Sequence, residues 1–169
     1  MIAPLRYDGL LYRAINPIYA REPLSGEGAK RYGGRFNRKG TPALYLSLSI
    51  PTACREANQA GRFQPIVVVS YEAKIDGLFD GRDANALAEF GMSAQALADD
   101  SWRNQMAQQG VARTQTFADQ LSKAGHNGLL VRSFAHGATN NDLNIVLWRW
   151  GAEPPVRLVV IDDEGRLSR

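Results

Sequence analysis

Residues 33–57 read GGRFNRKGTPALYLSLSIPTACREA, and this stretch indicates more about the fold than any other part of the sequence. Its glycine-rich opening is typical of a turn, and the apolar residues at 42–47 predict a strand. Ser49 precedes a helical pattern over residues 50–60, and serine is favoured just before a helix because its hydroxyl accepts a backbone N–H. The stretch therefore predicts a turn, a strand and a helix in succession.

The segment before it, residues 16–40, is rich in Gly, Pro, Ser and basic residues and follows a short predicted strand at residues 10–14. Structureless loops of this length are uncommon in compact domains and are usually functional or disordered. Glycines let a backbone approach a ligand closely, and this segment holds Gly26, Gly28, Gly33, Gly34 and Gly40. We therefore predict a loop that wraps around a ligand.

The remainder of the chain predicts a strand, then helices, then strands again. Three consecutive valines within residues 66–71 predict a strand buried on both faces. Asp83 and Ser93 can each cap a short helix, and a longer helix is predicted over residues 114–125. Three closing strands are predicted at residues 128–132, 143–150 and 156–162. Early strands, clustered helices and late strands favour an α+β fold, with one domain over residues 1–169.

Composition narrows the class of protein. The net charge is only +3, which is too small to indicate a nucleic-acid-binding protein. The first 40 residues nevertheless carry a net charge of +5, which fits either an anionic ligand or an ordinary solvated basic face. One cysteine excludes a disulfide framework within the chain, and no segment predicts a signal peptide or a membrane span. We expect a cytoplasmic protein with no metal centre.

Three residues stand where chemistry is expected. Arg35 lies in GGRFN, Tyr45 in the predicted strand and Glu56 in the predicted helix, with gaps of 10 and 11 residues. This spacing can place a cation, a phenol and a carboxylate around one cleft, although each residue alone is also typical of a surface or a core. The sequence lacks GxGxxG and P-loop motifs, so any nucleotide would bind in another way.

The stretch from Tyr12 to Glu56 resembles the opening of the RES family, the toxin half of RES–Xre toxin–antitoxin pairs. The family is named for an arginine, a glutamate and a serine, which match Arg35, Glu56 and Ser133 in VRSF. The family's tyrosine matches Tyr45, and NNDLNIVLW at 140–148 resembles a family block that contains Asn144. Phe36 stands where a tryptophan is expected.

The resemblance implies an ADP-ribosyltransferase-like fold with a split antiparallel β-sheet, and NAD⁺ as the substrate cleaved at its nicotinamide–ribose bond. A carboxylate beside the ribose would stabilise the positive charge that develops there, and an aromatic face would suit the cationic nicotinamide ring. The implied catalytic set is Arg35, Tyr45 and Glu56. The residues implied to line the NAD⁺ site are Arg13, Asn37, Ser133 and Asn144.

Several alternatives remain open at this point. The acceptor of ADP-ribose could be a host protein, water or phosphate, because each gives the same first step. The expected partner is an Xre-type antitoxin that blocks the cleft. Outside this class, an RNase toxin is disfavoured by the modest charge. A non-catalytic peptide-binding module is the other alternative, and it predicts that Glu56 and Tyr45 are dispensable.

Overall fold

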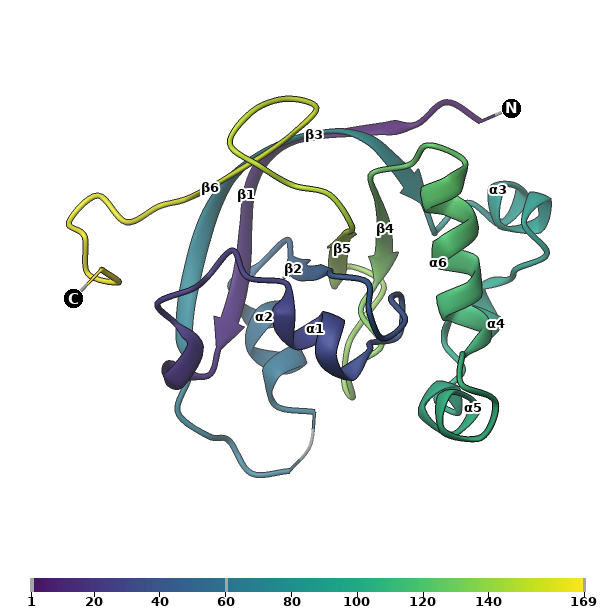
Figure 1. The fold of residues 1–169 in the computed structure, drawn as a ribbon, viewed down its shortest axis with the longest axis horizontal. Coiled ribbons are helices and arrows are strands. Elements are labelled where there is room, and N and C mark those ends of the chain that lie inside the picture. Colours follow the sequence, from purple (N-terminus) through teal and green to yellow (C-terminus); the bar gives the residue numbers. More distant parts are fainter. Residues whose placement is uncertain (1, 60, 169) are drawn as a thin grey trace.

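The computed structural model describes residues 2–59 and 61–168, and Figure 1 shows a curved sheet flanked by helices. The strands are β1 (Leu5–Ile15), β2 (Leu44–Ser47), β3 (Val67–Asp80), β4 (Gly128–Arg132), β5 (Leu143–Leu147) and β6 (Val156–Val160). The helices are α1 (Glu27–Tyr32), α2 (Ile50–Ala57), α3 (Ala84–Glu89), α4 (Ala94–Leu97), α5 (Trp102–Gln109) and α6 (Arg113–Lys123), with a 3-10 turn η1 (Pro17–Tyr19). The predicted α+β class is confirmed.

Hydrogen-bonded strands follow the order β1-β2-β5-β4-β3-β6, and β1 also pairs with β3. The first five strands of that order therefore form a closed circuit, and β6 joins β3 outside it. The β3–β4 pair is parallel, whereas the resemblance implied a split antiparallel sheet. The physical reason is the connection: α3 to α6 lie between these two strands, and parallel neighbours require such a long crossover.

Side chains of the short strands alternate between two cores, as the period of two in a strand requires. On β5, Ile145 and Leu147 belong to the core enclosed by the strands, whereas Val146 belongs to a second core under the helices. The second core packs β4 and β5 against α3, α4 and α6 through Leu87, Leu97, Phe117 and Leu121. The strands that carry the site are thus fixed from both faces.

Helices α3 and α4, the first two between β3 and β4, begin where their caps predict. The side chain of Asp83 accepts from the first backbone N–H groups of α3, and that of Ser93 does the same for α4. Figure 1 shows α3 to α6 gathered beyond β4 at one side of the sheet. Helix α5 lacks a predictive pattern in the sequence, and its single buried residue, Trp102, explains why.

Other predictions are corrected by the structure. The segment 16–40 contains η1 and α1, so it is not a structureless loop. Strand β3 runs on to Asp80, and Val68 is 38% exposed, so this strand is not buried on both faces. Strand β5 ends at Leu147, and helix α2 ends at Ala57; the predicted end of that helix, residue 60, lies outside the described residues.

Within residues 2–59 and 61–168, none of the helices combines the length and the hydropathy that crossing a bilayer would need.

Candidate active site

A tight turn at residues 34–37 carries Arg35 and Phe36 at its tip. Gly34 N donates to Asn37 O at 2.9 Å, and Asn37 N donates to Gly34 O at 3.4 Å. Tyr45 on β2 ties this turn to the sheet, because its hydroxyl accepts from Phe36 N at 3.1 Å and donates to Asn37 Oδ1 at 2.6 Å. A Cβ at Gly34 would clash with that hydroxyl oxygen, so the close approach requires glycine. Burial raises the pKa of the Tyr45 hydroxyl, which therefore stays protonated and can donate.

Asn37 lies inside the protein and not on a cavity wall of the candidate site. It is 1% exposed, and its amide donates to Ala29 O at 2.8 Å and to Thr41 O at 2.9 Å. With Oδ1 occupied by Tyr45, its side chain already has protein partners for both NH groups and for the oxygen. Asn37 therefore shapes the turn, in place of the direct ligand contact that the sequence predicted.

Two tryptophans that follow β5 hold the same region. Trp148 Nε1 donates to Phe36 O at 2.8 Å, and Trp150 Nε1 donates to Leu24 O at 3.0 Å. Each indole donates its single N–H to a backbone carbonyl of segment 16–40. This segment is consequently a fixed wall, held from β2 and from the end of β5.

Arg35 is held by the chain between α4 and α5. Its Nη1 donates to the carbonyls of Leu97 and Asp99, each at 2.9 Å, and its Nη2 lies 3.2 Å from the Asp100 carboxylate. The guanidinium carbon also lies 4.5 Å from the centre of the Phe134 ring, within cation–π range. Burial lowers the pKa of Arg35 and the Asp100 carboxylate opposes that change, but an arginine remains charged in any case. The cation is thus fixed in place, with a side chain only 13% exposed.

Glu56, on the second turn of α2, is the centre of a hydrogen-bond network. Its Oε1 accepts from the Ser133 hydroxyl and from Asn144 Nδ2, the latter at 2.6 Å. Its Oε2 accepts from Gln59 one turn further on. Ser47 Oγ in turn donates to Asn144 Oδ1 at 2.7 Å, which fixes the orientation of that amide. Three neutral groups therefore orient one carboxylate, with Ser47 holding one of them in place, and none of them neutralises its charge.

Asp142 connects the strand pair β4–β5 to helix α2. Its Oδ1 accepts from Thr52 Oγ1 at 2.6 Å and from Arg55 Nη1 at 2.8 Å. Its Oδ2 accepts from Thr139 N at 2.7 Å, and this bond is the main cause of a pKa lowered to about 2. Ser133 N also donates to Asp142 O at 2.7 Å. Asp142 thereby keeps the strand ends that bear Ser133 and Asn144 beside the helix that bears Glu56.

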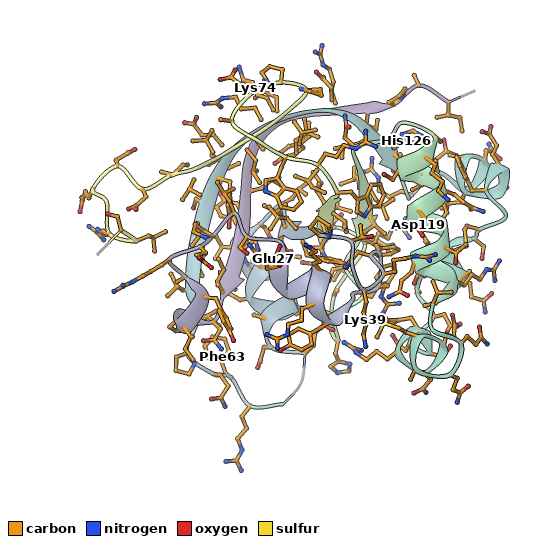
Figure 2. The ribbon with its side chains drawn as sticks, viewed as in Figure 1. Glu27, Lys39, Phe63, Lys74, Asp119 and His126 are labelled. Atoms are coloured by element: carbon orange, nitrogen blue, oxygen red, sulfur yellow. The ribbon has the colours of Figure 1, made fainter. Side chains whose placement is uncertain are left out.

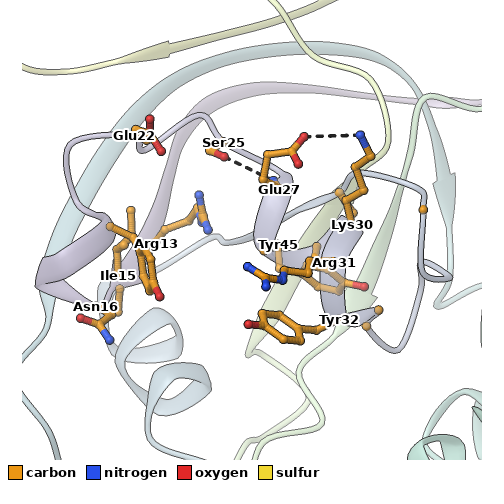
Figure 3. Close-up of a pocket in the computed structure, with 18 residues that line it drawn as sticks. Arg13, Ile15, Asn16, Glu22, Ser25, Glu27, Lys30, Arg31, Tyr32 and Tyr45 are labelled. Carbon is orange, nitrogen blue, oxygen red and sulfur yellow. Dashed lines mark hydrogen bonds and ion pairs between the residues drawn. The ribbon is translucent and has the colours of Figure 1, made fainter. Parts of the chain in front are cut away.

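Three cavities meet at Tyr45. The largest, of about 890 Å³, is bordered by β1, η1 and α1, and Figure 3 shows Arg13, Arg31, Tyr32 and Tyr45 around it. A second, of about 270 Å³, is lined by Arg35, Tyr45, Glu56, Gln59, Trp102, Arg103, Arg132, Phe134 and Asn144, among others. A third, of about 260 Å³, is lined by Tyr12, Arg13, Tyr45, Ser47, Glu56 and Asn144, among others. Glu56 and Asn144 thus border the second and the third, and Arg13 borders the first and the third.

The charges around the largest cavity are mixed. Lys30 and Glu27 of α1 form an ion pair at 3.6 Å, drawn as a dashed line in Figure 3. Arg13 Nη1 donates to Pro23 O at 2.9 Å, which places this cation at the boundary between the cavities. Figure 2 shows Glu27 near the middle of the molecule. Arg13 therefore brings one cation to the region where the first and third cavities join.

The structure brings Arg35, Tyr45, Glu56 and Asn144 together around the second cavity. Ser133 donates a hydrogen bond to the Glu56 carboxylate but lines a separate cavity, of about 220 Å³. Sequence reasoning missed Gln59 and Ser47, the two groups that complete the Glu56 network. The one available signal was Gln59 standing three residues after Glu56, a spacing that makes helical neighbours. Among the described residues, no group of three or more His, Cys, Asp and Glu is placed to hold a metal ion.

Comparisons with known proteins point to one family. The sequence profile described as the RES domain matches residues 10–169. The chain is also similar to a protein named "Toxin Res" from Photorhabdus laumondii subsp. laumondii, 43% identical over 47 residues, which cover 28% of this chain and 30% of the relative. A protein of the same name from Yersinia enterocolitica is 43% identical over 47 residues, 28% of this chain and 31% of that one. The matched stretch thus spans less than a third of either relative.

Proposed function

The chain belongs to the RES domain family, and on that premise we propose that it is the toxin of a toxin–antitoxin pair and acts by breaking the nicotinamide–ribose bond of NAD⁺. The proposal extends to this chain the word "toxin" in the names of its two relatives. It also takes the fold to be a variant of the ADP-ribosyltransferase type, and the chain to act in the cytoplasm.

The carboxylate of Glu56 is the observation that carries this proposal. It is anionic, oriented by Ser133, Asn144 and Gln59, and borders two cavities that meet at Tyr45. A preorganised anion of this kind stabilises positive charge that develops nearby, and it needs no rearrangement at the moment of reaction. Breaking a glycosidic bond develops such charge on the sugar, as an oxocarbenium ion.

The reaction follows from this charge. As the bond between ribose C1′ and nicotinamide N1 breaks, its electron pair leaves with the ring, which departs as neutral nicotinamide. The ribose becomes cationic, and Glu56 attracts it more strongly than it attracts the ground state, which is the condition for catalysis. An acceptor oxygen then bonds to C1′ and loses its proton, if it has one, to solvent. No general acid is required for the leaving group.

The arrangement of the cavities supports a dinucleotide as the substrate. The nicotinamide half is assigned to the second cavity, where Tyr45 and Phe134 supply aromatic faces for the cationic ring. Arg13 lies between the first and third cavities, where it can pair with the pyrophosphate. The adenylate half is assigned to the largest cavity, whose volume of about 890 Å³ lies in the range of ligand sites. Both N–H groups of Arg35 Nη1 donate to backbone carbonyls of the protein. Arg35 therefore contributes a fixed positive charge at the cavity wall.

The test is to incubate purified protein with NAD⁺ labelled on the adenylate, with and without phosphate and with host lysate, and to measure free nicotinamide. Glu56→Gln keeps the side-chain volume but removes the charge, so nicotinamide release should fall by about 10²–10³-fold. The matched control is Glu89→Gln, an exposed glutamate of α3 that lines none of the cavities described above, which should keep wild-type activity. Full activity in Glu56→Gln would contradict the role given to the carboxylate.

The same assay separates the alternatives. Label in a protein band identifies a transferase, and label in small molecules identifies depletion of NAD⁺, with phosphate dependence separating phosphorolysis from hydrolysis. No nicotinamide release from the wild-type protein would refute the proposal and favour an RNase toxin or a peptide-binding module. The antitoxin, proposed to be of the Xre type, should block nicotinamide release in the same assay by covering the mouth of the cleft.

A further inference from the structure

We infer that Gln115 of α6 is a positioning residue of the candidate active site, which sets the turn that carries Arg35. The side chain is 0% exposed, although glutamine is mostly found at protein surfaces. Burying an amide without partners is costly, so a buried glutamine has its hydrogen bonds made by the protein. The partners of this one are therefore informative.

Both ends of the 34–37 turn accept hydrogen bonds from the same amide. Gln115 Nε2 donates to Gly34 O at 2.9 Å and to Asn37 O at 3.0 Å. These carbonyls are also the ones that close the turn, since each accepts from the backbone N–H of the other residue. The two protons of one planar NH₂ group therefore bracket the turn and fix the separation of its ends.

The other end of the side chain is anchored as firmly. Gln115 Oε1 accepts from Ala112 N at 2.9 Å, which completes the first turn of α6. Helix α6 is itself fixed, because Phe117, Ala118 and Leu121 pack into the core under β4 and β5. A rigid helix thus holds the turn through one amide, in addition to the hydrogen bonds from Tyr45 and Trp148.

This arrangement concerns function and not only stability. An apolar residue of the same volume would fill the site with no amide to desolvate, but it would leave the two ends of the turn without their common donor. Arg35 and Phe36 lie between those ends, at the tip of the turn. Displacing a group by about 1 Å at a catalytic site can cost about 100-fold in rate. This inference rests on the proposed function insofar as Arg35 serves NAD⁺ cleavage.

The experiment replaces Gln115 by methionine, which keeps the volume and removes the donors, and measures kcat and KM for NAD⁺. We expect kcat/KM to fall by about 10- to 100-fold. In an Arg35→Ala background, Gln115→Met should lower it by less than about twofold, because Gln115 acts through the turn that carries Arg35. Gln120→Ala, an exposed glutamine on the same helix, is the matched control and should leave kcat/KM unchanged.

Amide hydrogen exchange supplies a measurement that does not depend on activity. In Gln115→Met, the amides of Gly34 and Asn37 should exchange at least about tenfold faster, whereas the amide of Leu130 on β4 should keep its rate. If the methionine variant does not fold, Gln115→Asn provides the same comparison, because its amide is one carbon too short to reach both carbonyls.

The outcomes are distinguishable. Equal losses of kcat/KM in the wild-type and Arg35→Ala backgrounds, or unchanged exchange at Gly34 and Asn37, would overturn the inference. A wild-type protein that releases no nicotinamide would instead refute the proposed function, and the exchange rates would still decide whether Gln115 holds the turn.

Discussion

Replacing Tyr45 by phenylalanine removes one oxygen atom and two hydrogen bonds. The hydroxyl accepts from Phe36 N at 3.1 Å and donates to Asn37 Oδ1 at 2.6 Å, so the variant leaves one donor and one acceptor without their partner. A buried group left unsatisfied costs about 1–3 kcal/mol. The free energy of unfolding should therefore fall by about 2–4 kcal/mol, after some relaxation of the turn. For a chain of this size the melting temperature should fall by about 5–15 °C.

Thermal and urea unfolding of Tyr45→Phe measure this cost directly. Tyr32→Phe is the control, because Tyr32 is 65% exposed, and its unfolding free energy should stay within about 0.5 kcal/mol of wild type. The pH dependence gives a second check. Since burial raises the pKa of Tyr45, the unfolded chain loses this proton at lower pH than the folded protein does. Wild-type stability should therefore fall as the pH rises above about 10, and this part of the fall should be missing in the variant. A Tyr45→Phe protein as stable as wild type would refute the reasoning.

Two further predictions concern the supports of the site. Gly34→Ala should lower the unfolding free energy by about 1–3 kcal/mol and reduce nicotinamide release, because the added Cβ meets the Tyr45 hydroxyl. In Gly28→Ala the added Cβ meets nothing within 4 Å, so the unfolding free energy should instead rise by about 0.5–1 kcal/mol. Equal thermal shifts of the two variants would contradict this account. The Thr139 N–H and the other partners of Asp142 lower the pKa of its carboxyl from the ordinary value of 3.8 to about 2. The carboxylate therefore contributes its full stability at pH values above 3.8, and this contribution is lost as the pH falls toward 2. Asp142→Asn should be less stable than wild type at pH 7 and should show a smaller loss of stability between pH 4 and pH 2; acid unfolding curves that run parallel for the two proteins would count against this role.

Local sequence signals predicted the elements whose causes are local. Asp83 and Ser93 cap α3 and α4 because a side-chain oxygen followed by free backbone N–H groups is enough to begin a helix. Strand β4 was predicted at its observed bounds, Gly128–Arg132, because its apolar run ends at an exposed arginine. Helix α5 was missed because its exposed face is polar and one buried tryptophan makes no periodic pattern.

Longer-range features had no such signal. The bounds of β3 were predicted too short, because the alternation of exposed and buried positions stops after Ile75 and the pairing partners of this strand on β1, β4 and β6 are remote in the sequence. The parallel β3–β4 pair depends on where a helical crossover returns to the sheet, which no single segment specifies. The 16–40 segment seemed structureless because the groups that fix it, Trp148 and Trp150 among them, lie more than 100 residues away.

The candidate site divides in the same way. The sequence by itself determined that a glycine-rich turn, a strand tyrosine and a helix glutamate follow one another closely, and this spacing indicated a cleft bordered by Arg35, Tyr45 and Glu56. Only the tertiary structure decided what each side chain touches: Arg35 is clamped by two carbonyls, Asn37 is buried behind the turn, and Glu56 accepts bonds from Ser133 and Asn144. The physical reason is that spacing along a chain fixes only near neighbours. A hydrogen bond across 77 or 88 residues depends on how the whole sheet and its two cores pack.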